Sequence, residues 1–507
     1  MFFYGERTGV CMRKLRRAVL WLVVISLSML SFFISPKEAR AVSEGDIKEI
    51  GTNIMVEDVF ENSSDVKYYK FTMDKTGYFD IAFNIPGIDV KEHDGWTVTL
   101  LDSDGNSTIY SFNVTGNTIL PKLPFVKGKT FYLKMELYGW PVATDVNYQF
   151  QVNTYEVTNW EVEYNDSMDS ANNICADVTY CGNLMYSNDT DYYHFVMDRT
   201  GYFNISFSIP EVGANVQKGW RLSVYVEDRL VHSFTLTSNA TMCPYAFREG
   251  TNIYIKIEAE SVYSTPRYTE YNLKVNGTTS SLWEQESNDS ISAASVMDLG
   301  EIYSGTIYQG EDVDYYKVTT TQKGFLTISL DPNNLAENLG DGYALNVYAS
   351  DNTQLYSLSS ITAVSNIRLY LNKGDYYIRI GNNNASRNPG IYNVYKLSAT
   401  SAVAGKPGKA KVKSVKGTTY VYWLTTYDNI TYKLNCVKNA SGYQIQISTS
   451  KKFNKNKTTI FSGQTGTIGS NLLKKKRYYI RARAYYETPL GEKTYGKWSS
   501  VKSAKTK

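Results

Sequence analysis

The chain repeats three blocks of sequence: EVEYNDS at 161–167, DTDYYHF at 189–195 and GYFNISFSI at 201–209. Related blocks follow 123 residues downstream in the same order, as EQESNDS at 284–290, DVDYY at 312–316 and GFLTISL at 324–330. A period of this length is that of a folded domain and exceeds that of a solenoid repeat. We therefore expect tandem copies of one module.

A further, degenerate copy lies upstream. MDKTGYF at 73–79 matches MDRTGYF at 197–203 at a spacing of 124 residues. This copy lacks the acidic opening block, and it carries Lys67 where the other copies carry Asp191 and Asp314. We expect the chemistry of those acids to be absent from the first copy.

The third block of each copy alternates apolar and polar residues with the period of two that a half-buried strand requires. Tyrosine is unusually frequent at 43 residues, and aromatic and β-branched residues favour strands. After the first forty residues we find no long stretch of helical apolar periodicity. These patterns predict an all-β protein built from tandem β-sandwich modules.

The first 41 residues have the pattern of an export signal peptide. Basic residues at 13–17 precede an apolar run at 18–34, and the small-residue pattern at 39–41 is typical of a cleavage site. We expect cleavage after Ala41; the alternative is an uncleaved anchor, because 17 apolar residues lie near the lower limit for spanning a bilayer. Whether translation starts at Met1 or Met12 stays open. The prediction is a secreted, extracellular or cell-surface protein with no membrane span after signal cleavage.

The repeats and a change of composition divide the chain into five segments. They are a signal peptide at 1–41, a degenerate module at 42–155, full modules at 156–280 and 281–403, and a fourth domain at 406–507. The fourth domain has 22 Lys and Arg residues against three acids, a net charge of +19, whereas the rest of the chain is at −16. Such asymmetry suggests an anionic partner.

The exposed basic turn expected just before residue 478 is our candidate polyanion-binding site. Its residues are Lys474, Lys475, Lys476 and Arg477. Nucleic acid is a poor partner for an exported chain, so anionic cell-wall polymer is the predicted ligand. The alternative is a surface that only keeps the protein soluble.

Cysteine usage leaves the disulfides open. Cys175 and Cys181 lie close together in the module at 156–280, and Cys243 lies further along the same module. An exported protein could join two of these three thiols, and a Cys175–Cys181 bridge is one candidate pairing. Buried free thiols are the alternative.

The signature E-x-E-x-N-D-S, then D-x-D-Y-Y and a glycine-led strand, resembles the bacterial pre-peptidase C-terminal (PPC) domain family. These are β-sandwich modules usually appended to secreted peptidases, and the resemblance implies three jelly-roll-like sandwiches. It covers residues 156–403 well and the first copy only from Asp65 onward. In relatives that include collagenase collagen-binding modules, the acidic opening and a downstream Asp bind calcium.

The resemblance implies a structural calcium site in each full module. The implied ligands are Glu161, Glu163, Asn165, Asp166 and Asp189 in one module and Glu284, Glu286, Asn288, Asp289 and Asp312 in the other, with Asp191 and Asp314 as adjacent candidates. Independently, calcium takes six to eight oxygen ligands, and so many neighbouring acids would repel one another without a cation. The alternative is a solvated acidic linker in which Asn and Asp cap a short turn.

The fourth domain resembles a fibronectin type III domain. The run YYIRARA at 478–484 places Tyr478, Ile480, Ala482 and Ala484 on one strand face. A tyrosine so placed after a turn can return its hydroxyl to the backbone, as in the tyrosine corner of immunoglobulin-like sandwiches. The resemblance implies one immunoglobulin-like sandwich after the three PPC-type modules.

Catalytic motifs are not apparent. The chain has only three histidines and shows no H-E-x-x-H, G-x-S-x-G or phosphate-loop pattern. We therefore expect no enzyme but an exported binding or scaffold protein, which adheres to extracellular protein or polysaccharide through calcium-stabilised modules. The alternative is an accessory subunit that docks onto a separately encoded secreted peptidase or glycan hydrolase.

Overall fold

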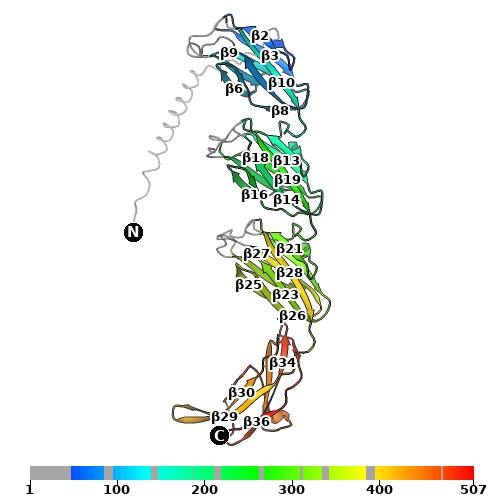
Figure 1. Ribbon diagram of the computed structural model, residues 1–507, viewed down its shortest axis with the longest axis vertical. Helices are drawn as coiled ribbons and strands as arrows, with labels where there is room; N and C mark the ends of the chain where they lie inside the picture. Colours follow the sequence, from blue (N-terminus) through cyan, green and yellow to red (C-terminus); the bar gives the residue numbers. More distant parts are fainter. Residues whose placement is uncertain are drawn as a thin grey trace, which may run out of the picture. The chain divides into compact units, whose positions relative to one another are not determined.

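The computed structural model describes residues 47–84, 95–138, 145, 147–186, 188–210, 219–261, 268–308, 312–333, 342–383, 394–469 and 472–507. The predicted signal peptide lies outside these residues. Strands dominate the described residues, which confirms the predicted all-β fold of β-sandwich modules (Figure 1). No helix within these ranges is long and apolar enough to cross a membrane. The chain forms two compact units, Met1–Thr158 and Asn159–Lys507.

The first module, in the first unit, has two sheets. One has the order β1 (Ile47–Glu49), β3 (Val66–Thr72), β9 (Thr130–Leu137), β5 (Trp96–Leu101) and β6 (Thr108–Val114). The other has the order β2 (Val56–Val59), β10 (Asn147–Glu156), β4 (Gly77–Asn84) and β7 (Thr118–Ile119), with β8 (Leu123–Phe125) also paired to β4. Phe79, Ile81 and Phe83 of β4 are buried, as the alternation of apolar and polar residues predicts. The same alternation continues to Ile85, which lies outside the described residues.

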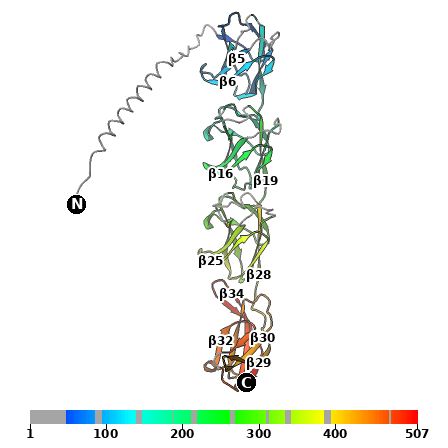
Figure 2. The same cartoon turned by 90° about the vertical axis from the view of Figure 1, so that its left-hand side faces the viewer.

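The second module repeats this sheet order. Its first sheet is β11 (Asn172–Asn173), β13 (Thr190–Val196), β18 (Asn252–Ala259), β15 (Trp220–Val226) and β16 (Arg229–Leu236). Its second sheet is β12 (Thr179–Gly182), β19 (Tyr271–Thr279), β14 (Gly201–Ser208) and β17 (Ala240–Thr241), and the 3-10 helix η2 (Met168–Ser170) precedes β11. Figure 2 shows β16 and β19 in these two separate layers.

The third module has the same arrangement again. Its first sheet is β20 (Ser295–Val296), β22 (Val313–Thr320), β27 (Gly374–Asn382), β24 (Tyr343–Ala349) and β25 (Gln354–Ile361). Its second sheet is β21 (Ile302–Thr306), β28 (Val394–Val403), β23 (Gly324–Asp331) and β26 (Ser365–Leu371), and η3 (Ile291–Ala293) precedes β20. In each of the three modules the short first strand runs parallel to its neighbour, and the other described strands pair in antiparallel fashion.

The fourth domain also contains two sheets. One has the order β29 (Val412–Tyr422), β30 (Thr425–Leu434) and β33 (Gly466–Ile468). The other has the order β32 (Thr458–Ser462), β31 (Gly442–Ser448), β34 (Arg477–Glu487) and β35 (Lys493–Tyr495), with β36 (Lys502–Lys505) paired to β34 and η5 (Lys455–Lys457) before β32. The Tyr478 hydroxyl accepts a hydrogen bond from the Leu473 N–H at 2.9 Å, so it returns to the backbone as predicted.

The candidate Cys175–Cys181 disulfide is not formed. None of the four cysteines in the described part of the chain takes part in a disulfide. Cys181 lies on β12, where its thiol donates to Asn272 Oδ1 of the neighbouring strand β19 at 3.1 Å. Cys175 is exposed and follows β11, which belongs to the other sheet. The two thiols therefore have different surroundings despite their closeness in sequence.

Candidate metal centres

In the second module, hydrogen bonds hold the acidic loop at 161–167 against the start of β13. The Asn165 carbonyl oxygen accepts from the Tyr192 N–H at 2.9 Å. The side chain of Asn172 accepts from the Val162 N–H at 2.6 Å and donates to the Val162 carbonyl oxygen at 3.0 Å. Backbone pairing thus brings acids that are distant in sequence to one end of the sandwich.

Five carboxylates meet there. Glu161, Glu163 and Asp191 each place one oxygen within 4.8 Å of the others, and Glu163, Asp166 and Asp189 do the same. Glu163 belongs to both groups, so the five acids form one cluster. All are buried except Asp166, which is exposed. The structure therefore brings together every predicted acidic ligand of this module, and we call this cluster with Asn165 the second-module cage.

Two tyrosines orient part of the cage. The hydroxyls of Tyr193 and Tyr271 lie 2.7 Å apart, and their oxygens are 3.1 and 3.2 Å from Glu161 Oε2. Tyr271 also hydrogen bonds to Asp191 Oδ2, and the other oxygen of Glu161 accepts from the Asn183 N–H at 2.6 Å. Both oxygens of Glu161 therefore have protein donors within reach, whereas Asp191 Oδ1 has none.

Several buried oxygens of the cage have no hydrogen-bond donor. They are Glu163 Oε1 and Oε2, Asn165 Oδ1 and Asp191 Oδ1. A buried anionic oxygen without a partner is strongly unfavourable, and a bound cation removes that cost. The donor set consists of carboxylate and amide oxygens, without His or Cys in the clusters, which is the set that a hard cation such as calcium prefers. The residues present fit a calcium ion.

Electrostatics within the cage favours a cation or bound protons. Burial, and then nearby acids, raise the pKa of Glu161 to about 8 and that of Asp189 to about 7. The same two causes raise the pKa of Glu163 and Asp191 well above the ordinary range. Protons and a metal ion therefore compete for the same oxygens at neutral pH.

The third module builds the same cage 123 residues later. Glu284, Glu286 and Asp314 form one group, and Glu286, Asp289 and Asp312 form the other. The Tyr316 and Tyr395 hydroxyls are 2.7 Å apart and reach Glu284 Oε2 at 3.4 and 3.3 Å. Glu286 Oε1, Asn288 Oδ1 and Asp314 Oδ1 are buried without a donor. We call this set with Asn288 the third-module cage.

The third-module cage lies against the second module. The Glu286 N–H donates to the Ala246 carbonyl oxygen at 2.8 Å, and the Tyr308 hydroxyl accepts from the Ala246 N–H at 2.9 Å. The Tyr308 N–H in turn donates to Asp312 Oδ2 at 2.6 Å. Arg229 of the second module lies 3.8 Å from Asp289. Residues of the third-module cage thus take part in the junction between these modules.

The first module replaces the cage by an internal ion pair. Lys67 occupies the β3 position that pairs with Met135, just as Asp191 pairs with Ile257 on the corresponding strands. Its ammonium lies 3.6 Å from Asp58, and Lys48 approaches Asp58 at the same distance. The tyrosine pair is retained, because the Tyr69 hydroxyl contacts that of Tyr148 at 2.6 Å and donates to Asp58 at 2.9 Å. Lysine side chains therefore supply positive charge at this end of the first module.

Sequence reasoning missed the buried tyrosine pairs and the glycines beside them. A Cβ on Gly182 would lie 2.5 Å from the Tyr271 hydroxyl and 2.6 Å from that of Tyr193, and Gly305 is equally crowded by its own tyrosines. These glycines and tyrosines recur at the repeat spacing, and this recurrence could have identified them as a shared part of the architecture of both modules. Their role was hidden because aromatic residues in strands are expected in any β core.

The predicted basic turn is where the sequence places it. Lys474, Lys475, Lys476 and Arg477 are exposed; the three lysines lie in the turn before β34, and Arg477 is the first residue of that strand. The Lys476 N–H donates to Thr506 Oγ1 at 2.9 Å. The turn is a solvent-facing basic surface.

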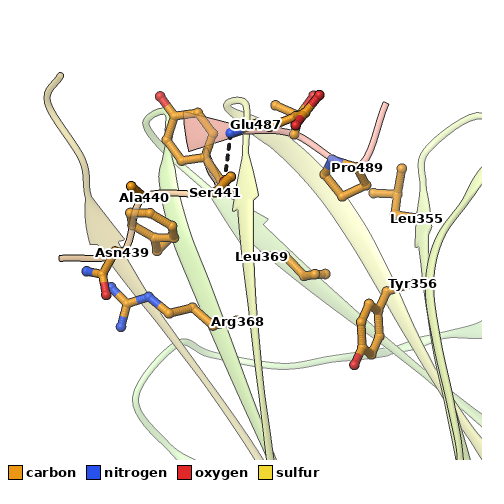
Figure 3. A pocket seen from close by; sticks show the side chains of 12 residues that line it. Leu355, Tyr356, Arg368, Leu369, Asn439, Ala440, Ser441, Glu487 and Pro489 are labelled. Atoms are coloured by element: carbon orange, nitrogen blue, oxygen red, sulfur yellow. Dashed lines mark hydrogen bonds between the residues drawn. The ribbon is translucent and has the colours of Figure 1, made fainter. Parts of the chain in front are cut away.

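A cleft of about 490 Å³ lies between the third module and the fourth domain (Figure 3). Leu355, Tyr356 and Arg368 line it from the third module, and Ala440 and Pro489 line it from the fourth domain. Ser441 accepts a hydrogen bond from the Glu487 N–H at 3.0 Å at its edge. The cleft contains none of the predicted site residues.

No protein-family profile matches the sequence, and no curated protein sequence matches it. Among solved structures, the chain is similar to the pre-peptidase C-terminal domain of collagenase from Bacillus anthracis, with 22% identity over 21% of this chain and 94% of that chain, and a TM-score of 0.17. The CUB1-EGF-CUB2 domain of human MASP-1/3 matches with 9% identity over 44% and 100% of the two chains, and a TM-score of 0.14. A GH2 β-galacturonidase from Eisenbergiella tayi matches with 12% identity over 39% and 36%, and a TM-score of 0.13.

Proposed function

We propose that the chain is an exported, non-catalytic binding and scaffold protein with three PPC-type modules and a fibronectin type III-like domain. In this proposal calcium stabilises the second and third modules. The observation that carries it is the pair of buried cages, whose donor-free oxygens recur 123 residues apart. Acids repeated at matching places in tandem modules suit structural ions better than a single active site.

In the second-module cage, Glu163, Asn165 and Asp191 would hold the ion through their donor-free oxygens. Asp166 and Asp189 would complete the oxygen shell, because each has an oxygen in the group that includes Glu163. Glu161 would add a further negative charge beside these ligands, because one of its oxygens belongs to the group with Glu163 and Asp191. The ion would supply charge neutralisation and join the acidic loop to β13.

Calcium stoichiometry tests this assignment. Isothermal titration of the chain from Val42 onward should give two ions per molecule. Asp191→Asn should remove one ion, and the combined Asp191→Asn and Asp314→Asn variant should remove both. Asp58→Asn in the first module is the matched control and should leave the count at two. A count that stays at two in the combined variant would rule out these cages.

The proposed ligand is an extracellular protein or polysaccharide, and the basic turn is proposed to attract anionic cell-wall polymer. Retention of the chain on protein films and insoluble polysaccharides, compared in calcium and in chelator, tests adhesion. No retention on any surface, together with a stable complex with a co-secreted hydrolase, would favour the accessory role instead.

A further inference from the structure

Strands β29 and β30 form a hairpin that projects from the body of the fourth domain (Figure 1). Its register runs from Val412 opposite Leu434 to Tyr422 opposite Thr425. The third strand of the sheet, β33, pairs with β30 only at 430–432. Beyond that point every residue at 419–427 is exposed. A two-stranded ribbon alone is marginally stable in water, so this part of the hairpin is not explained by packing in the domain core.

The tip of the hairpin is apolar. Trp423 is 84% exposed and Leu424 is fully exposed at 104%, and Tyr420, Val421 and Tyr422 beside them are also exposed. Trp423 and Leu424 both have left-handed backbone conformations, with φ of 49°. Such turn positions favour Gly, Asn or Asp, so neither turn geometry nor burial accounts for a Trp-Leu pair there. Exposed apolar clusters of this kind mark interaction sites.

Basic residues surround the base of the same hairpin. The Lys502 ammonium donates to the Lys413 carbonyl oxygen at 2.6 Å. A Cβ on Gly417 would lie 2.1 Å from the Lys505 carbonyl oxygen, and Lys505 pairs with Arg477 in the neighbouring sheet. The hairpin therefore leaves the domain beside β36 and the start of β34. We define the basic collar as Lys413, Lys416, Lys502, Lys505 and the turn at 474–477, all of it near the base of the hairpin in the chain's fold.

We propose that this hairpin inserts its tip into the interfacial region of an anionic phospholipid bilayer while the basic collar contacts the lipid phosphates. Trp and Tyr favour the membrane interface, and Lys and Arg near it are attracted by anionic headgroups. At about 3.3 Å per strand residue, the exposed part of the hairpin reaches roughly 15 Å beyond the sheet. That reach exceeds the roughly 5–10 Å by which interfacial segments enter a leaflet.

Charge complementarity and the tip together select this partner. The domain's net charge of +19 complements any polyanion, but a soluble wall polymer would leave the Trp423 and Leu424 side chains in water. Sugar stacking would use the tyrosine rings and would leave Leu424 unexplained. An anionic bilayer accounts for both the basic collar and the aliphatic tip.

The test uses the chain from Val42 onward, so that the apolar run at 18–34 cannot bind lipid. Sedimentation with vesicles of phosphatidylglycerol and phosphatidylcholine is compared with sedimentation with phosphatidylcholine alone. We expect binding only to the anionic vesicles, and quenching of tryptophan fluorescence by lipids brominated in their acyl chains. Trp423→Ser combined with Leu424→Ser should reduce vesicle binding roughly ten-fold or more, because it removes the apolar contact.

Leu490→Ser is the matched control, because Leu490 is exposed on the same domain away from the hairpin. It should bind vesicles as the parent chain does. The tip variant should keep its unfolding temperature and its binding to a soluble anionic polymer. The proposal is overturned by absence of vesicle binding. The proposal is also overturned if the tip variant still binds the vesicles and the parent chain shows no quenching of tryptophan fluorescence. That result would assign the basic collar to wall polymer.

Discussion

One strand position distinguishes the first module from the two that carry cages. Asp58 on β2 pairs with Tyr148, and Gly182 on β12 pairs with Tyr271 in the same register. In the first module the Asp58 carboxylate itself accepts from a tyrosine of the pair. In the second module the glycine leaves space, and Glu161 reaches the pair from the acidic loop. The tyrosine pair thus contacts a carboxylate in both modules. In the first module the carboxylate comes from a strand aspartate beside a lysine, and in the second it comes from a loop glutamate beside a glycine.

Adding a methyl group at this position should disrupt the second-module cage. Gly182→Ala places a Cβ within 2.6 Å of both tyrosine hydroxyls, which are buried and cannot move away freely. We expect a loss of about 1–3 kcal/mol in unfolding free energy from this overpacking. Chemical unfolding measures it, with Gly116→Ala as the control, because a Cβ there has no neighbour within 4 Å. Equal stability of the two variants would contradict this account of the glycine.

The raised carboxylate pKa values predict how stability depends on pH without metal. The pKa of Glu161 and of Glu284 is about 8 in the folded chain, above the usual 4.5, and that of Asp189 and Asp312 is about 7. The folded modules then bind more protons than the unfolded chain. The stability that these carboxyl groups contribute is therefore fully present below about pH 4 and is lost as the pH rises through 7 to 8.

In chelator the unfolding temperature should therefore fall between about pH 5 and about pH 8. Calcium keeps these groups ionised, so its stabilising effect should grow over the same interval. Thermal unfolding at several pH values in each medium measures both slopes. A stability in chelator that increases with pH would show that the acids are not buried together.

The sequence predicted the acids of both cages but not how they are held. The motifs E-x-E-x-N-D-S and D-x-D can be read directly from the sequence, and their resemblance to PPC modules suggested a metal site. The alternation that buries Tyr193 is equally visible, but its hydroxyl contact with Tyr271 depends on pairing across two sheets. Those two tyrosines are 78 positions apart, so their contact forms only when the chain between them has folded. The exchange of Asp191 for Lys67 was apparent from alignment of the repeats alone.

At the scale of elements, the loop before β22 joins two modules. The Tyr308 ring stacks near Tyr245 and Phe247 of the second module, with ring centroids 5.4 and 5.9 Å away. Tyr308 is counted in the buried core of that module, yet its N–H holds Asp312 of the third-module cage. A cation in the third module should therefore also stabilise the junction.

Substitution of Tyr308 should separate the two modules. Tyr308→Phe leaves the buried Ala246 N–H without its acceptor, at a cost of about 1–3 kcal/mol, and Tyr308→Ala removes the ring, at roughly 3–5 kcal/mol. In calcium, calorimetry should show one shared transition for the modules in the parent chain and two in Tyr308→Ala. Val296→Ala, at an exposed position on β20, should keep the shared transition. A shared transition in every variant would mean that the junction lies elsewhere.

Regular elements were predictable where the alternation is strict, as in β4, β14 and β34, because one face of each packs in a core. The hairpin tip was not. Its sequence has the composition of an ordinary strand pair rich in tyrosine. Only the sheet order shows that the residues at the tip have no third strand beside them in the described part of the chain. The short parallel strands β1, β11 and β20 were missed for a similar reason, since two or three residues carry no period.

For the molecule as a whole, the charge asymmetry concentrates positive potential on the fourth domain. At low ionic strength this should retain the chain on immobilised anionic cell-wall polymer, and salt should release it as screening shortens the Debye length below about 8 Å. Serine at positions 474, 475, 476 and 477 should remove most of the retention without affecting the core that begins at Tyr478.

The matched control removes the same number of charges elsewhere on the domain, by substituting Ser for Lys451, Lys452, Lys455 and Lys457, which are all exposed. This variant should retain more binding than the 474–477 variant. If both lose retention equally, net charge alone is responsible. If neither loses it, adhesion lies in the modules.

We propose that calcium stabilises the second and third modules through their acidic cages. Scanning calorimetry of the chain from Val42 onward, in millimolar calcium and in chelator, tests this proposal beside the combined Asp191→Asn and Asp314→Asn variant. A ligand at 100 times its Kd adds about 2.7 kcal/mol to the stability of its module. We expect calcium to raise the unfolding temperature of the parent chain and to leave that of the variant unchanged. If the parent chain unfolds at the same temperature in calcium and in chelator, calcium does not stabilise these modules.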